Sequence, residues 1–328
     1  MLPFERIERQ VFEKRQAKTD PKFGMDPENR PIDTLLDFGV IPVNKPKGPT
    51  SHQVSSYVQK ILNIKKSGHS GTLDPKVTGV LPVAIGRATR IVQALLPSGK
   101  EYVCIMHLHN EAEPDTIREV MKSFVGKIKQ LPPIKSSVKR DWRYRKIYYL
   151  QILEIDGKDI LFRVGCQAGT YIRKLCHDIG DKLGTGAHMA ELIRTKAGPF
   201  NDSEMYTLQE LRDAVEYQKE GNERFLRTII KPIEYGVRHL PKVWVLDSAI
   251  EPICHGTDLA RPGVAKVESD IQVDEMVAIM SLKDELIAIG QVKMISKDML
   301  KDERGIAVKS DKVFMLPGTY PRITKDSL

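Results

Sequence analysis

Residues 146–167 predict a long β-hairpin. Along residues 160–167 every second side chain is apolar, which is the pattern of a strand that buries one face. An Asp156-Gly157 pair separates this strand from the apolar run before it, and Asp-Gly is a preferred turn sequence in hairpins. Residues 172–183 follow with apolar side chains spaced as one helical face, with Thr170 placed to cap that helix. A hairpin leading into a helix favours an α+β fold with an antiparallel or mixed sheet over a regularly alternating parallel one.

Two further regions precede this hairpin. Residues 1–35 mix basic and acidic side chains with little periodicity, so we expect a charged, loosely held N-terminal arm. The α+β domain then spans residues 36–240. It contains two more helical faces, one at 54–62 after a Thr-Ser pair that can cap it, and one at 117–125.

Residues 241–322 have a different character. Short β segments follow one another there, among them 276–282, 286–292 and 313–316. Several short strands in so few residues favour a small β-barrel as a separate domain.

The composition limits the class of protein. The chain has 51 Lys and Arg against 43 Asp and Glu, a net charge of +8, and residues 1–240 carry this excess. The longest apolar run, 79–86, is far too short to span a bilayer, and the charged first residues predict no secretory signal. The four cysteines, at 104, 166, 176 and 254, form no CxxC pair, which argues against a zinc ribbon or a disulfide framework. We therefore expect a cytoplasmic protein.

Three glycine-rich segments, 68–86, 99–108 and 169–175, place polar side chains beside apolar elements. The first contains Asp74 and the third contains Arg173. A guanidinium close to a carboxylate holds it ionised and oriented, and an ionised aspartate can attack a sugar carbon as a nucleophile. Taken singly, such residues are more often turn residues, packed aromatics or surface charges.

Together these segments resemble the pseudouridine synthases of the TruB type. Residues 68–86 resemble that family's catalytic-aspartate motif, including the strings GTLDP and GVLPVAIG. Residues 99–102 and 169–175 resemble its second and third motifs, and residues 186–200 resemble the segment after them. The order and the spacing of these motifs also resemble those of the family, so the resemblance covers residues 36–325. Within the family it is greatest to the archaeal homologues of dyskerin, the catalytic subunits of H/ACA guide-RNA particles.

The resemblance implies isomerisation of uridine to pseudouridine in RNA, with the target nucleotide extruded from the stack. It implies that Asp74 is the catalytic aspartate, that Arg173 pairs with it, and that Tyr102 stacks on the target base and is a candidate to take the proton from C5. Residues implied to lie near the flipped uridine or to shape its pocket are His69, Lys100, Tyr171 and Leu192. Whether Asp74 attacks C1′ or C6, or assists an elimination, stays open. The reaction is redox-neutral, so no cofactor and no metal are implied.

Two segments are candidates for RNA contacts. Residues 135–146 hold six basic residues, one acid and two interleaved aromatics, which suits RNA, although a solvated hairpin face is the alternative. The predicted RNA-binding residues there are Lys139, Arg140, Arg143 and Arg145. Residues 254–264 resemble part of a PUA domain, although glycine and proline there also shape turns. The contacts implied by that resemblance are His255, Gly256, Arg261 and Pro262.

The implied partners are an H/ACA guide RNA, a substrate rRNA or tRNA, and three core proteins. These proteins are a small zinc-binding core protein, a glycine/arginine-type core protein and a kink-turn-binding ribosomal protein. One alternative is a stand-alone pseudouridine synthase for tRNA. Another, of a different class, is a non-catalytic RNA-binding scaffold in ribosome assembly.

Overall fold

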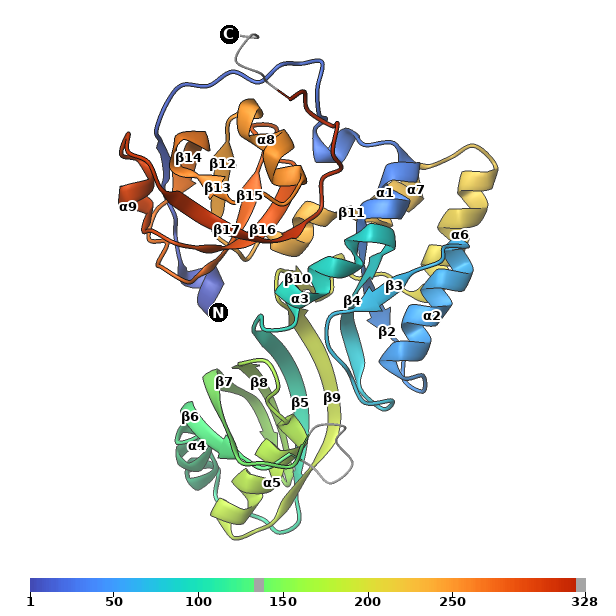
Figure 1. The fold of residues 1–328 in the computed structure, drawn as a ribbon. Helices are drawn as coiled ribbons and strands as arrows, with labels where there is room; N and C mark the ends of the chain where they lie inside the picture. The colour runs from blue at the N-terminus through green and yellow to red at the C-terminus, as the bar shows by residue number, and fades with distance from the viewer. Residues whose placement is uncertain (133–138, 323–328) are drawn as a thin grey trace. The chain divides into compact units, whose positions relative to one another are not determined.

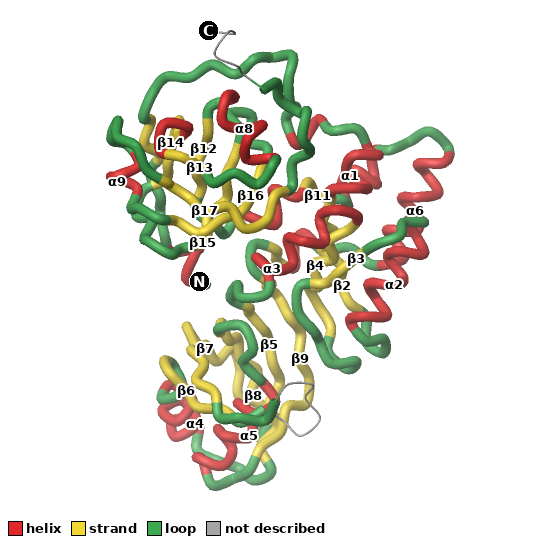
Figure 2. The backbone as a smooth tube through the Cα atoms, in the orientation of Figure 1, coloured by secondary structure: helices red, strands yellow, loops and turns green. Residues whose placement is uncertain are grey.

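The structure is a computed structural model that describes residues 1–132 and 139–322 (Figures 1 and 2). It divides into two compact units. The first contains Met1–Arg6, Ile41–Val83 and Val92–Ile229. The second contains Ile7–Val40, Ala84–Ile91 and Ile230–Leu328, the last of these described up to residue 322. Within the described residues, no helix combines the length and the apolar character needed to span a bilayer.

The first unit is built on a mixed β-sheet in the order β2-β4-β9-β5-β8-β7-β6, with β3 beside β4 and β10 beside β9. β4 and β9 run parallel, whereas β5 pairs antiparallel with both β8 and β9. The strands are β2 (Gly39–Lys45), β3 (Ser67–His69), β4 (Thr78–Ile85), β5 (Lys100–Leu108), β6 (Gly126–Gln130), β7 (Arg143–Asp156), β8 (Asp159–Cys166), β9 (Ala187–Ala197) and β10 (Phe200–Asn201). This arrangement confirms the predicted α+β class and the hairpin, in which Asp156 faces Asp159.

Helices bury one face of this sheet. Apolar residues of α4 and α5 form one core with β5, β7 and β8, to which Ile117, Phe162 and Ile179 belong. The helices of the unit are α2 (Ser51–Leu62), α3 (Val92–Leu95), α4 (Pro114–Lys122), α5 (Ile172–Leu183), α6 (Leu208–Lys219) and α7 (Arg224–Ile229). The predicted faces at 54–62 and 172–183 are helical, whereas the face predicted at 117–125 is helical only up to Lys122, and Val125 beyond it is exposed.

The helix starts agree with the sequence in one case and differ in another. Thr50 caps α2 and forms a reciprocal capping box with Gln53, as its position predicts. At α5 the predicted cap is wrong, because the Thr170 hydroxyl donates to the Gln167 carbonyl oxygen at 2.7 Å. Tyr171 occupies the N-cap position there without a side-chain cap.

The second unit contains a seven-stranded sheet in the order β1-β14-β12-β15-β16-β17-β13 around one apolar core. Its strands are β1 (Val11–Glu13), β12 (Lys242–Val245), β13 (Leu259–Ala260), β14 (Val264–Glu268), β15 (Met276–Met280), β16 (Leu286–Val292) and β17 (Ile306–Val313), and β11 (Lys231–Pro232) pairs with the start of β2. Its helices are α1 (Ile32–Phe38), α8 (Asp247–Cys254) and α9 (Ser296–Met299). The predicted strand at 313–316 is wrong: the mixed polar segment 306–313 forms β17 instead, since its Ala307 and Val308 point into the core.

The N-terminal segment is held more firmly than its charge pattern predicts. β1 adds an antiparallel strand to β14, and Phe12 and Phe23 pack against the core of the second unit. The Lys14 ammonium donates to the carbonyl oxygens of Arg261 and Lys301. A few apolar anchors among many charges are enough to fix the segment, and they leave no periodic signal.

Candidate active site

Asp74 and Arg173 form an ion pair, as the sequence predicts, although 99 residues separate them. Asp74 lies in the loop between β3 and β4, and Arg173 lies in the first turn of α5. Both side chains are about half exposed, with values of 53% and 51%. The guanidinium therefore orients a carboxylate that solvent, and thus a substrate, can reach.

A buried lysine forms hydrogen bonds with the backbone of the Asp74 loop. Lys45, at the end of β2, is fully buried, and its ammonium donates to the carbonyl oxygens of Pro46 and Val77 at 2.9 Å each and of Pro75 at 3.2 Å. Burial lowers the pKa of Lys45, with Arg194 as the second cause. Sequence reasoning missed this residue, although a lysine that ends a buried apolar strand was a signal.

Tyr102 lies on β5 directly opposite Arg194 of β9. The tyrosine is half-buried, whereas Arg194 is only 1% exposed. The Arg194 guanidinium donates from Nε to the Val80 carbonyl oxygen at 2.8 Å and from Nη2 to that of Gly71 at 3.3 Å. Arg194 was missed from the sequence; the signal was a charged residue at an inward position of a strand.

His69 and Leu192 lie on elements that border this group. His69 ends β3 and is half-buried, and burial, followed by Arg194, lowers its pKa. Its Nδ1 atom is buried and has no hydrogen-bond partner among the described residues. Leu192 pairs across the strands with Cys104 and packs against the core under β5. These contacts suit the pocket-lining positions predicted for both residues.

Lys100 and Tyr171 hold local backbone. The Lys100 ammonium is buried and donates to the carbonyl oxygens of Leu95, Leu96 and Ser98 at 2.8 to 3.1 Å. Burial, followed by Arg194, lowers its pKa to about 7. The backbone of Tyr171 exchanges two hydrogen bonds with the Gln130 side chain. Lys100 therefore stabilises the turn at residues 95–98.

In the basic segment at 135–146, residues 143–146 lie at the start of β7, residues 139–142 precede that strand, and residues 135–138 fall outside the described part of the chain. Trp142 and Tyr144 are 59% and 57% exposed, and the ammonium groups of Lys129 and Lys127 lie over their rings. Of the predicted contacts, Lys139 and Arg140 are exposed and Arg143 and Arg145 are half-buried. Exposed aromatics flanked by cations can stack with unpaired bases.

In the second unit, His255, Gly256 and Pro262 are exposed. His255 contacts Glu251 at 2.9 Å. Arg261 is 8% exposed, and its guanidinium pairs with Glu303 at 2.7 Å. Arg261 is therefore the one residue of these four that is buried, and its guanidinium is already engaged by a carboxylate.

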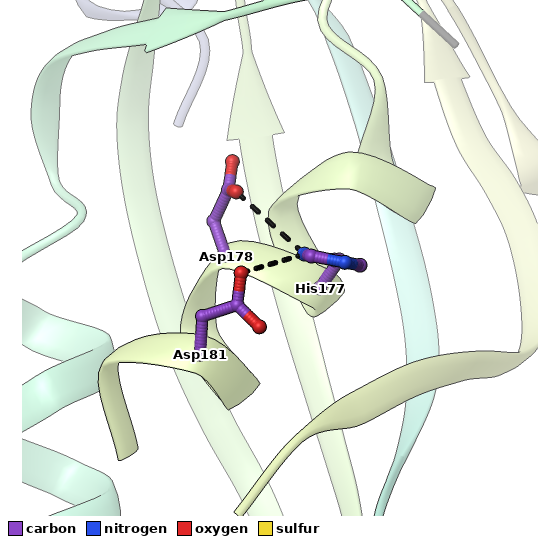
Figure 3. Close-up of side chains that lie close together, drawn as sticks. All are labelled: His177, Asp178 and Asp181. Atoms are coloured by element: carbon purple, nitrogen blue, oxygen red, sulfur yellow. Dashed lines mark ion pairs between the residues drawn. The ribbon is translucent and has the colours of Figure 1, made fainter. Parts of the chain in front are cut away.

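His177, Asp178 and Asp181 on α5 bring metal-binding atom types within 4.8 Å of one another (Figure 3). The His177 imidazole lies 2.9 Å from Asp181, and the Lys174 ammonium pairs with Asp178. Two of the three side chains are exposed. The cluster is therefore accounted for by ion pairs along one helix face.

Four family models match consecutive parts of the chain. Residues 59–172 match the N-terminal domain of the TruB family of pseudouridylate synthases, and residues 173–238 match the C-terminal domain of tRNA pseudouridylate synthase B. Residues 241–314 match the PUA domain, and residues 3–55 match the DKCLD domain. The motifs at Asp74, Tyr102 and Arg173 thus lie inside the TruB matches.

Relatives that match over nearly the whole chain support the same family. A protein of Methanopyrus kandleri named probable tRNA pseudouridine synthase B is 53% identical over 322 residues, covering 98% of this chain and 95% of the relative. A protein of Thermococcus onnurineus with the same name is 55% identical, with coverages of 97% and 96%. A crystal structure described as a Cbf5-Nop10-Gar1 complex contains a chain that is 54% identical, with coverages of 98% and 99% and a TM-score of 0.94. A chain in an H/ACA RNP bound to a substrate RNA containing 2′-deoxyuridine is 52% identical, with coverages of 98% and 99% and a TM-score of 0.92. The chain therefore belongs to the TruB family of pseudouridylate synthases and carries a PUA domain and a DKCLD domain.

Proposed function

We propose that this protein isomerises uridine to pseudouridine in RNA as the catalytic subunit of an H/ACA guide-RNA particle, with Asp74 as the nucleophile. The observation that carries the proposal is the accessible Asp74–Arg173 pair beside Tyr102 in a TruB-family chain. The H/ACA part rests on the whole-length similarity to chains solved in H/ACA and Cbf5-Nop10-Gar1 complexes. The partners are then a guide RNA, a substrate rRNA or tRNA and the H/ACA core proteins, and the setting is the cytoplasm.

The proposed domains are a catalytic domain at 36–240, an RNA-binding PUA domain at 241–322 and an N-terminal arm at 1–35. The PUA match at 241–314 and the TruB matches up to residue 238 support the boundary near residue 240. The arm contacts both units: Glu5 pairs with Lys196 of β9, and β1 pairs with β14 of the second unit.

The proposed chemistry uses three side chains. The Arg173 guanidinium keeps the Asp74 carboxylate oriented toward the extruded nucleotide. Asp74 attacks C1′ or C6, and the N1–C1′ bond breaks while the base stays bound. The base turns so that C5 bonds to C1′, the bond to Asp74 breaks, and Tyr102 stacks on the base throughout. C5 then loses its proton and N1 gains one, so atoms and electrons balance without an external oxidant or reductant. The pocket is shaped by His69, Lys100, Tyr171 and Leu192. RNA is bound by Lys139, Arg140, Arg143 and Arg145 of the basic segment and by His255, Gly256, Arg261 and Pro262 of the second unit.

Replacing Asp74 by asparagine tests the catalytic assignment. We expect no pseudouridine from the variant when product is measured by mass spectrometry after a single turnover on target RNA with guide RNA and core proteins. The control is Asp181→Asn, which removes an exposed carboxylate of α5 that lies outside the site. Product from Asp74→Asn at the wild-type rate would refute the proposal. Mapping a covalent bond formed with 5-fluorouridine RNA would distinguish attack at C1′ from attack at C6.

A second function is supported by the relatives named probable tRNA pseudouridine synthase B. If the chain modifies tRNA alone, purified protein without guide RNA or core proteins converts a tRNA uridine at a rate that adding them does not increase. RNA binding without product under either condition would instead indicate a scaffold.

A further inference from the structure

Arg194 is a buried cation under the catalytic pocket. It is 1% exposed, and no carboxylate among the described residues pairs with it. Burying a charge is costly unless hydrogen bonds compensate it. The hydrogen bonds that compensate the burial of the Arg194 charge therefore indicate which parts of the structure this residue stabilises.

The guanidinium of Arg194 connects three elements. Its Nε donates to the Val80 carbonyl oxygen on β4, and its Nη2 donates to the Gly71 carbonyl oxygen in the loop that leads to Asp74. Tyr102 lies directly opposite Arg194 on β5, so the two side chains are neighbours on one face of the sheet. One planar group thus lies against the tyrosine while it holds the loop that leads to Asp74, and the single ammonium of a lysine lacks this planar shape.

The backbone around Arg194 leaves little room for change. A Cβ atom at Gly79, which pairs with Arg194 across β4 and β9, would lie 2.2 Å from the Arg194 carbonyl oxygen. A Cβ atom at Gly71 would lie 3.6 Å from Arg194 Nη1, and Gly71 has a φ of +118°. Gly79 therefore permits the close approach of β4 and β9 at Arg194, whereas at Gly71 the positive φ, and not a lack of space, favours glycine.

Arg194 affects Tyr102 through its charge as well as through its position. Burial raises the pKa of Tyr102, and the neighbouring guanidinium acts in the opposite direction. A positive charge beside the hydroxyl stabilises negative charge that develops on its oxygen. Arg194 favours such charge because no acid among the described residues neutralises it.

We propose that Arg194 is a positioning residue. It holds the Tyr102 hydroxyl and the Gly71 turn at the relative positions that reaction with the target uracil requires. The inference deepens the proposed function and rests on the role of Tyr102 in it. Arg194 itself touches no reacting atom, so it acts through Tyr102 and through the loop that leads to Asp74.

Arg194→Lys, measured in the complete guide-RNA particle, tests this proposal. We expect a single-turnover rate about 100-fold below wild type, since small displacements of catalytic groups cost this much, with unchanged RNA affinity. In a Tyr102→Phe background the same substitution should add little further loss. The matched control is Arg163→Lys, at an exposed arginine of β8. A wild-type rate for Arg194→Lys, or the same loss with and without the Tyr102 hydroxyl, would overturn the proposal.

A spectroscopic measurement separates positioning from general destabilisation. In full-length protein labelled with ¹³Cζ-tyrosine, the Tyr102 resonance, assigned with Tyr102→Phe, should shift in Arg194→Lys and stay in place in Arg163→Lys. If Arg194→Lys does not fold, Tyr102→Phe tests the same contact, because loss of the hydroxyl should shift the Arg194 side-chain ¹⁵N resonances. Unshifted resonances would overturn the proposal. These spectra do not require turnover, so they remain decisive even if an active Asp74→Asn disproves the proposed function.

Discussion

Replacing Lys100 with methionine tests whether burial or hydrogen bonding controls the charge of this lysine. Lys100 is 5% exposed, and its ammonium contacts three carbonyl oxygens of the turn at residues 95–98. The carbonyl oxygens favour the charged form, whereas burial and the nearby Arg194 disfavour it. The net result is a pKa lowered to about 7, against the ordinary lysine value of 10.5.

The sign of the pH dependence follows from this shift. Between these two pKa values the unfolded chain carries a proton that the folded chain has lost, so the free energy of unfolding rises with pH. From pH 7, where Lys100 is half protonated, to pH 9, Lys100 alone should raise the free energy of unfolding by about 2 kcal/mol. The methionine variant has no proton to lose and should lack this increase.

Urea denaturation followed by far-UV circular dichroism at pH 7, 8 and 9 measures the difference between wild type and Lys100→Met. The control is Lys76→Met, which removes an exposed lysine and should follow the wild-type pH dependence. A constant difference between wild type and Lys100→Met across this range would show that Lys100 stays charged in the folded protein. The carbonyl contacts would then outweigh burial, and the reasoning above would be refuted.

Two other substitutions have expected outcomes. Gly79→Ala should cost about 3 kcal/mol or more in unfolding free energy, because its Cβ meets the Arg194 backbone at a φ of +103°. Gly157→Ala, at a φ of +53° in open space, should cost only about 1 kcal/mol by the same denaturation measurement. Trp142→Ala should weaken RNA binding by about 1 to 3 kcal/mol in a filter-binding titration, since a ring that is 59% exposed offers a surface on which a base can stack. Replacing the exposed Leu153 by alanine is the control, and an equal effect of both changes would exclude stacking.

The sequence predicts local structure where one periodic pattern controls it. The β7–β8 hairpin and the capped helix α2 depend on alternation, an Asp-Gly turn and a Thr-Gln capping pair that lie close together in the chain. The cap of α5 was predicted one residue too early. Tyr171 occupies the N-cap position, and the Thr170 hydroxyl donates to the Gln167 carbonyl oxygen instead.

The residues of the candidate active site also fall into a group that the sequence predicts and a group that it does not. The Asp74–Arg173 pair could be predicted because both residues lie in motifs that resemble a known family. Lys45 and Arg194 were missed, because the sequence signal was only a charged residue on a buried strand, and the carbonyl oxygens to which each residue donates cannot be identified from the sequence. Strand register decides which carbonyls they meet, and that register is set by pairings between distant segments.

The buried charges of the first unit are distributed unevenly. Lys45 and Arg194 are at most 1% exposed, and both donate to carbonyl oxygens of the loop that carries Asp74. The buried carboxylate nearby, Glu101, points to the other side of β5, because neighbouring strand residues alternate, and it accepts a hydrogen bond from Thr195 at 2.8 Å. Positive charge therefore stays under the pocket and favours an anionic group above it. Buried charges are screened little by salt, so this field should persist at ionic strengths that weaken the exposed RNA-binding surface.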